Sequence, residues 1–426
     1  MKTLAIIGGG AAGLMAAINA AAFARQHNES LQVEVYEADA ERIGRSILAT
    51  GNGRCNFSNE NPCSSSYYNS EFVQSVFGVL ESLLKLNMVD ADPINPVHAQ
   101  FEQLGLCWQV QGEGRMYPMS NKAATVLNVL RQALQRFGVA VHVNKRCERI
   151  GASANGTGVY NICFADGCVV HTNAVVVCVG GRAIEGVQLP RVIACKKPRA
   201  ILGPLAVSEQ GRKITRTLNN IRVRCVAVLV QKTAAGYKQL ASESGELLFR
   251  NYGVSGVCVF NLSRFVKPNC QVRINLLPNI PANDVTNFLH ARFSMLEQTF
   301  GGHITGKQFC EGMLLPQVAA AVFAQAGLSA SADLKASHLK KLASAMTQLT
   351  FDVEGVYTKQ QCQVHRGGLD TACFKSNCEA QSLHGFFAAG EALDVDGPCG
   401  GFNLHWAWAS GMVAGSSAAL SLVYGV

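Results

Sequence analysis

The sequence predicts an α/β protein of the doubly wound, Rossmann-like type that is interrupted by a second domain. Three observations predict this fold class. The chain opens with a short buried strand, a glycine-rich turn and an Ala-rich helix. A fully apolar strand over residues 174–179 ends in Gly180 and Gly181. The pattern of strand, glycine turn and helix then returns after Gly385, following a long stretch with a different hydrophobic pattern.

The bulk composition limits the class of protein. With 426 residues, 48% hydrophobic and 15% charged, the chain is long enough for two or three domains with a large core. Its net charge of +8 comes from scattered basic residues with no run of five or more, so we expect no nucleic-acid partner. No apolar run reaches roughly 18 residues and no leader pattern precedes the first strand, so we expect a cytoplasmic protein without a membrane span. The 16 cysteines are then expected to be reduced, and without a Cys-x-x-Cys pair we expect no metal site.

Periodicity places the elements of the first domain in order. Buried strands are expected over residues 4–7, 32–36, 139–143 and 174–179, and helices over 14–25, 71–86 and 122–137. A hairpin of residues 159–165 and 168–172 is expected around Asp166 and Gly167, a two-residue turn signal.

The hydrophobic pattern of the sequence changes after Pro190. Strands are expected over residues 222–231, 246–250 and 271–277, and residues 283–346 are mostly helical in pattern. We therefore expect a first domain over 1–189 and 351–426, and an inserted substrate domain over 190–350. The insert divides into a β-rich part, 190–282, and a helical part, 283–350.

The first glycine turn carries the strongest local signal for chemistry. Its pattern is Gly-x-Gly-x-x-Gly, placed between a strand and a helix. Gly8 allows the tight turn, Gly10 lets the backbone approach a pyrophosphate, and Gly13 allows close packing of helix on strand. The free N–H groups at the helix start, at Ala11 and Ala12, then face the anion. This pattern predicts a dinucleotide site.

An acidic residue supports the same site. Glu37 ends the second strand 24 residues after Gly13. A carboxylate there can accept hydrogen bonds from both hydroxyls of an adenosine ribose and would repel a 2′-phosphate.

The far C-terminus favours FAD over NAD as the cofactor. Gly390, Glu391 and Asp394 follow a short apolar strand, as in flavoproteins that place a late turn against the ribityl–pyrophosphate arm. A helix then begins after Gly401, and its positive end suits a flavin pyrimidine. We expect the residues that begin this helix to bind the cofactor: Gly401, Phe402 and Asn403. An NAD enzyme needs no such return, and no second Gly-x-Gly-x-x-Gly provides a separate nicotinamide domain.

Several stretches together resemble a family of bacterial NAD(P)/FAD-dependent oxidoreductases that includes aminoacetone oxidase and the flavoproteins of bile-acid dehydroxylation. The similar stretches, in chain order, are residues 44–46, 50–56, 245–249, 253–256, 365–369 and 390–408, and they span nearly the whole chain. The Gly-Arg-Cys-Asn and Trp-Ala-Trp stretches are specific. The resemblance implies a glutathione-reductase-like FAD domain, a β-barrel-like insert and a small helical cap. Members carry a longer loop after the strand that here ends at Gly181.

The sequence also offers candidate residues near the flavin. Arg45 is a candidate for the cofactor phosphates, because its planar fork suits them, or it is a surface arginine. Gly53 is expected at the cofactor, and its neighbours Arg54 and Asn56 are candidates for catalysis. His405, one turn into the last helix, is a third candidate or a core histidine.

The sequence therefore predicts an FAD-dependent oxidoreductase that transfers a hydride between the flavin and a small organic substrate or NAD(P)H. It names no substrate, and the oligomeric state stays open. One alternative is an FAD-dependent RNA-modifying enzyme, which would favour a clustered basic face and a reactive cysteine in the insert. The other is a flavin-binding protein without turnover.

Overall fold

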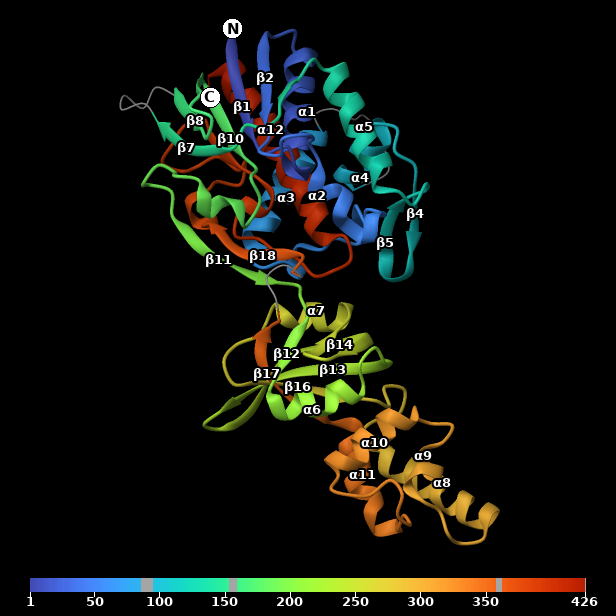
Figure 1. The fold of residues 1–426 in the computed structure, drawn as a ribbon. Helices are drawn as coiled ribbons and strands as arrows, with labels where there is room; N and C mark the ends of the chain where they lie inside the picture. Colours follow the sequence, from blue (N-terminus) through green and yellow to red (C-terminus); the bar gives the residue numbers. More distant parts are fainter. Residues whose placement is uncertain (86–94, 153–158, 358–361, 426) are drawn as a thin grey trace. The chain divides into compact units, whose positions relative to one another are not determined.

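The computed structural model describes residues 1–85, 95–152, 159–357 and 362–425, and the chain forms two compact units (Figure 1). Unit 1 holds residues 1–199 and 364–426, and unit 2 holds residues 200–363. The sequence predicts that the insert begins at residue 190 and that the first domain returns at residue 351, whereas unit 2 begins at residue 200 and ends at residue 363. The structure divides the chain later because the strand at that point, β17 (Leu349–Val356), pairs with two strands of unit 2.

A five-stranded sheet forms the centre of unit 1, with all neighbouring strands parallel. Its order is β19 (Phe386–Ala388), β10 (Ala174–Val177), β1 (Lys2–Ile7), β2 (Leu31–Tyr36) and β6 (Ala140–His142). Every residue of β10 is buried, which explains its uninterrupted apolar sequence. The Rossmann-like sheet expected from the sequence is present, and its outermost strand β19 comes from the far end of the chain.

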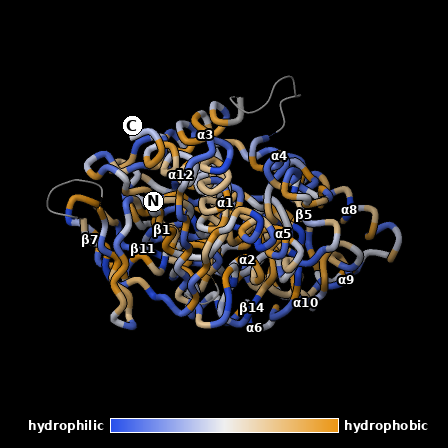
Figure 2. The backbone as a smooth tube through the Cα atoms, turned by 90° about the horizontal axis from the view of Figure 1, so that it is seen from above, coloured by the Kyte–Doolittle hydropathy of each residue, from blue (hydrophilic) through white to orange (hydrophobic). Residues whose placement is uncertain are grey.

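Two helices from opposite ends of the chain pack against one another in this unit: α1 (Ala11–Gln26) and α12 (Phe402–Tyr424). Both consist largely of small or apolar residues, as the colouring of α1 in Figure 2 shows. A Cβ atom added at Gly411 would lie 2.5 Å from the carbonyl oxygen of Ala12, and one at Gly415 would lie 2.1 Å from that of Ala16. Small residues at these positions therefore let the two helix backbones approach closely.

Unit 1 also contains shorter elements around this centre. Its other helices are α2 (Arg45–Ala49), α3 (Ser70–Lys85), α4 (Pro96–Gln103) and α5 (Ala123–Arg136). Its smaller sheets are β3 (Ser58–Asn59), β5 (Arg115–Pro118) and β4 (Trp108–Gln111); β7 (Cys147–Ala152), β8 (Tyr160–Phe164) and β9 (Val169–Thr172); and the pair β11 (Cys195–Ile201) and β18 (Val364–Leu369). The hairpin predicted around Asp166 and Gly167 joins β8 to β9.

Unit 2 consists of a closed barrel and a helical part that share one hydrophobic core. The barrel strands, in spatial order, are β12 (Leu205–Val207), β15 (Gly253–Ser255), β14 (Gly236–Arg250), β13 (Arg222–Thr233), β16 (Cys270–Asn275) and β17. The helices are α6 (Glu209–Thr217), α7 (Val257–Ser263), α8 (Val285–Phe300), α9 (Gly306–Cys310), α10 (Pro316–Gln325) and α11 (Leu339–Thr347). Strand β14 is three times as long as the predicted strand over 246–250, because its first half pairs with β13 across a polar surface that the apolar pattern could not show.

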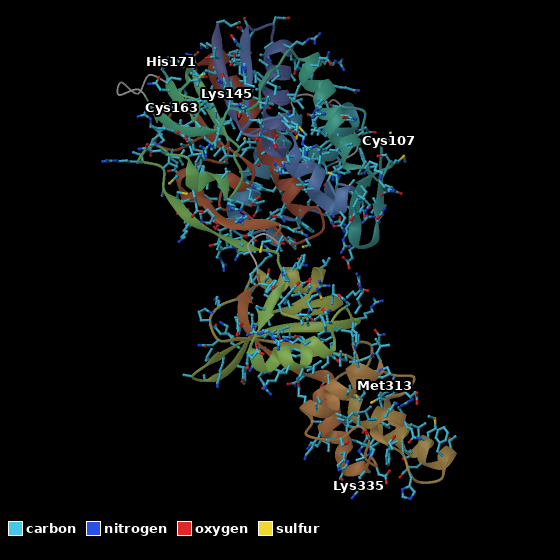
Figure 3. The ribbon with its side chains drawn as sticks, viewed as in Figure 1. Cys107, Lys145, Cys163, His171, Met313 and Lys335 are labelled. Atoms are coloured by element: carbon cyan, nitrogen blue, oxygen red, sulfur yellow. The ribbon has the colours of Figure 1, made fainter. Side chains whose placement is uncertain are left out.

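The cysteines and the helix lengths are two further features that the sequence analysis anticipates. Each of the 16 cysteines lies in the described part of the chain, and none of them forms a disulfide bond there. Cys107 and Cys163, for example, project from well-separated parts of unit 1 (Figure 3). Over the described residues, no helix is both long and apolar enough to cross a membrane.

Candidate functional site

The glycine turn after β1 is shaped for close backbone approach. Gly8 has a φ of +109°, and its N–H donates to the carbonyl of Tyr36 at 2.8 Å. A Cβ at Gly13 would lie 1.9 Å from the carbonyl oxygen of Gly8, so only glycine fits there. Within the described residues, no side chain caps the start of α1 at Gly10. The first N–H groups of this helix are thus available to an anion, as the motif predicts.

Glu37 lies directly beside this turn. Its two carboxylate oxygens accept the N–H groups of Gly9, at 2.7 Å, and Asp39, at 2.8 Å. Each oxygen keeps a second lone pair, which can accept a hydroxyl of a ribose. The structure therefore holds Glu37 against the glycine turn, and its contact with the adenosine ribose remains a prediction.

The next segment is tied to the same turn. The N–H of Gly44 donates to the carbonyl of Gly9 at 2.8 Å, and a Cβ at Gly10 would lie 3.4 Å from Oγ of Ser46. Ser46 is a neighbour of the turn that was not among the predicted site residues; its place in the family-like stretch 44–46, two residues after Gly44, is the signal that could have indicated it. Arg45 is 75% exposed and forms an ion pair with Asp39 at 3.1 Å, so its contact with phosphate remains a prediction.

Residues 50–56 form a strained loop. Gly51, Asn52, Gly53 and Cys55 all have left-handed φ values between +55° and +81°. Cys55 is completely buried, and burial raises the pKa of its thiol to about 12, so it is a neutral core residue. The guanidinium of the exposed Arg54 stacks over the ring of Tyr117, 4.4 Å from its centroid.

Asn56 has a different environment. Its side-chain oxygen is buried, and no donor among the described residues reaches it. A Cβ placed on Gly401 would lie 3.0 Å from this oxygen. A buried acceptor that no described donor reaches, next to a glycine without a side chain, suits a ligand with an N–H group.

The late glycine turn meets the first one. Gly390 has a φ of +68°, and a Cβ on it would lie 2.7 Å from the Cβ of Ala12. Its N–H donates to Oγ of Ser410 at 2.9 Å, and its carbonyl accepts the indole N–H of Trp406 at 3.0 Å. Glu391 accepts the backbone N–H of His365 at 2.7 Å. The structure thus brings the two predicted cofactor segments, Gly8–Gly13 and Gly390–Glu391, into contact.

Asp394 and its neighbour Asp396 are engaged inside the protein. Asp394 is 1% exposed; one oxygen accepts the N–H of Gly367 at 2.8 Å, and the other pairs with Lys196 at 3.1 Å. Asp396 receives two hydrogen bonds from Arg366, at 2.6 and 2.8 Å. These partners hold the late turn to β11 and β18, and neither pair could be recognised from the sequence pattern.

Gly401 begins α12 with a φ of +97°, and a Cβ on it would lie 2.1 Å from the carbonyl oxygen of Ser58. The preceding loop is closed by the amide of Asn403, which accepts the N–H of Gly397 at 2.8 Å and donates to its carbonyl at 2.9 Å. The carbonyl of Phe402 accepts the hydroxyl of Tyr67 at 2.9 Å. The side chain of Asn403 therefore shapes the turn, and the start of α12 lies against the segment that follows Asn56.

His405 is 2% exposed, and its Nδ1 lies 2.9 Å from Oγ of Ser58. Burial lowers the pKa of this imidazole to about 3, so it is neutral at physiological pH. Ser58 occupies Nδ1 of His405. Through this nitrogen, His405 could therefore act on a flavin only indirectly.

Comparison with known proteins places this geometry in context. A family model described as HI0933-like protein Rossmann domain matches residues 2–417. The 3-dehydro-bile acid delta(4,6)-reductase of Clostridium scindens is 30% identical over 98% of this chain and 99% of its own. The ribosomal RNA dihydrouridine synthase of Haemophilus influenzae is 25% identical over 95% of each chain. Among solved structures, the 3-ketosteroid delta1-dehydrogenase of Sterolibacterium denitrificans is 11% identical over 99% of this chain and 100% of that chain, with a TM-score of 0.46.

Proposed function

The chain belongs to the HI0933-like Rossmann family and is an FAD-dependent oxidoreductase, and from this premise we propose that it reduces a carbon–carbon double bond of a small organic substrate. NAD(P)H would supply the hydride by way of the flavin. The observation that carries the proposal is the contact between Gly390 and Ala12, which joins a pyrophosphate-binding turn to a second, late turn. A cofactor as long as FAD needs both.

The residues present fit FAD along its length. The bare start of α1 suits the pyrophosphate, and Glu37 suits the ribose. The unmatched oxygen of Asn56, next to Gly401, suits an N–H group at the flavin end. When bound, FAD supplies the hydride chemistry, and these residues of the chain hold and orient it.

The type of reaction is supported by what the relatives are named for. A delta(4,6)-reductase acts on carbon–carbon double bonds, and dihydrouridine is uridine with two hydrogens added across one such bond. Both products require a hydride and a proton at neighbouring carbon atoms. We propose the same reaction type for this chain, with unit 2 as the substrate-binding unit and the Gly253–Gly256 turn as a contact in it.

The test begins with the purified protein. Heat denaturation should release FAD, and anaerobic NADH or NADPH should bleach the flavin absorption band. The reduced protein is then mixed with conjugated enones, including a 3-oxo-Δ4 steroid, and with the matching saturated ketones. Reoxidation by the enones alone, with the saturated product formed, supports the proposal; FMN in place of FAD, or equal reoxidation by the saturated ketones, overturns it.

A second candidate acceptor is RNA, and the distribution of charge favours it. Residues 200–363 hold 17 of the 37 basic and 9 of the 29 acidic residues, so unit 2 carries a formal charge of +8. The other residues hold 20 of each sign and are neutral overall. A basic unit attached to a neutral one suits a polyanionic substrate. Reoxidation of the reduced protein by ribosomal RNA, with dihydrouridine formed and with weaker binding at higher salt, would favour this candidate over a small enone.

A further inference from the structure

A short segment after the strained loop contacts the first part of α12 and the turn before it at three successive residues. The carbonyl of Phe57 accepts the indole N–H of Trp408 at 2.8 Å. The side-chain amide of Asn59 donates to the carbonyl of Gly400 at 3.0 Å. Between them, the backbone of Ser58 lies so close to Gly401 that no side chain fits there. This segment, residues 57–59, therefore fixes where α12 begins.

The side chain of Ser58 continues the connection into the core. Its hydroxyl lies 2.7 Å from Nε2 of His98 on α4 and 2.9 Å from Nδ1 of His405 on α12. The three residues are 0%, 8% and 2% exposed. A hydroxyl has one proton, so it donates to one imidazole and accepts the N–H of the other. With both rings neutral, the link is complete when one ring presents its unprotonated nitrogen and the other its N–H to the hydroxyl.

Apolar rings surround this polar link. Phe57 and Trp108 lie against His98, and Phe77 lies against His405, with ring centroids 5.7 to 6.5 Å apart. The two imidazoles also meet each other edge to face at 5.8 Å. A buried network in which each member has its partner favours one arrangement, whereas an apolar core tolerates several. The link thus adds a directional constraint to a helix start that packing alone would hold less tightly.

We propose that Ser58, bonded to both His98 and His405, is a positioning residue that sets the place of the Gly400–Gly401 turn and of the first N–H groups of α12 relative to the flavin, and thereby sets the reduction potential of the flavin. The proposal rests on the proposed FAD site. Reduction adds negative charge to the flavin, and the positive end of a helix stabilises that charge only when it is close and correctly aimed. Loss of the link should lower the potential.

The experiment measures the potential of the FAD-loaded protein against reference dyes, together with FAD occupancy and thermal stability. Ser58→Ala removes the link and should lower the potential by about 30 mV, a tenfold loss of preference for the reduced form in a two-electron couple. His98→Gln and His405→Asn each keep a polar atom where Nε2 or Nδ1 lies. Each variant should therefore keep most of the wild-type reduction potential. Thr172→Val is the matched control, because Thr172 is a 3% exposed hydroxyl of the same unit that bonds the carbonyls of Thr3 and Ala174.

The outcomes separate this inference from the proposed cofactor. Wild-type protein that holds no FAD overturns the cofactor site and the inference with it. Protein that holds FAD, with an unchanged potential in Ser58→Ala, overturns the inference alone. The same holds if Thr172→Val shifts the potential equally, because general loosening would then explain both. Should Ser58→Ala fail to fold, His98→Leu breaks the same link from α4, and an unchanged potential in that variant counts against the inference.

Discussion

The buried histidine pair predicts a specific sensitivity of unit 1 to acid. Burial lowers the pKa of His98 to about 4 and that of His405 to about 3. An unfolded chain binds a proton on each imidazole near pH 6.5. Between pH 6.5 and the pKa values of the folded protein, the unfolded chain therefore holds more protons than the folded chain. The free energy of unfolding is thus at its full value above pH 6.5 and falls as the pH falls below 6.5.

The size of the effect follows from these values. At pH 5, an imidazole with a pKa of 6.5 is almost fully protonated in the unfolded chain, whereas both folded rings remain neutral. The free energy of unfolding should then fall by about 2 kcal/mol for each histidine, or about 4 kcal/mol for the pair, relative to pH 7 and above.

Urea unfolding at pH 7 and pH 5 measures this loss. All three tryptophans (Trp108, Trp406 and Trp408) lie in unit 1, so tryptophan fluorescence reports the unfolding of that unit. His405→Asn should reduce the loss between the two pH values by about 2 kcal/mol, since asparagine does not titrate. His27→Asn, at an exposed histidine of the same unit, is the control and should leave the loss unchanged. An equal loss in wild type, His405→Asn and His98→Gln would refute the reasoning.

Three further predictions concern the cofactor site and the core of unit 1. Glu37→Arg should weaken FAD binding by about 2–4 kcal/mol in a reconstitution titration, whereas Glu41→Arg should not, because only Glu37 contacts the glycine turn. Gly78→Ala should raise the unfolding free energy by about 0.5–1 kcal/mol, since a Cβ there meets open space within α3; a decrease in the melting temperature would contradict this. Asp396→Asn should lower the unfolding free energy by about 3–5 kcal/mol, because it leaves the charge of Arg366 without its carboxylate; urea unfolding measures this, and a loss below 1 kcal/mol would show that the pair is dispensable.

The sequence could predict those parts of the site that depend on local chemistry. The strand, turn and helix around Gly8 and Gly13 are specified within a few residues, and the structure gives both glycines the steric reasons expected of them. The late turn at Gly390 was likewise recognisable from its own residues. The structure brings the two turns together at Ala12, and their binding of one cofactor stays a prediction.

Partners that lie far apart in the chain could not be predicted in this way. Ser58 and His405 are 347 residues apart, and nothing near either one indicates the other. The same applies to Asp394, whose partner Lys196 is 198 residues away. The late boundary of unit 2 was missed for a related reason: β17 has the apolar alternation of any half-buried strand, and only its pairing with β12 and β16 assigns it to the barrel.

Ala12 shows why one domain needs both ends of the chain. It lies in the first turn of α1, where N–H groups must stay bare for an anion while the helix packs tightly. The two late contacts on it come from Gly390 and Gly411, and both positions exclude a side chain. The buried side of Ala12, away from the N–H groups, can thus be packed closely only by residues without side chains. These residues come from far along the chain. A bound cofactor should then stabilise residues 364–426 as well as the N-terminal turn, by about 2.7 kcal/mol at a hundredfold excess over Kd, because residues of both parts contact Ala12.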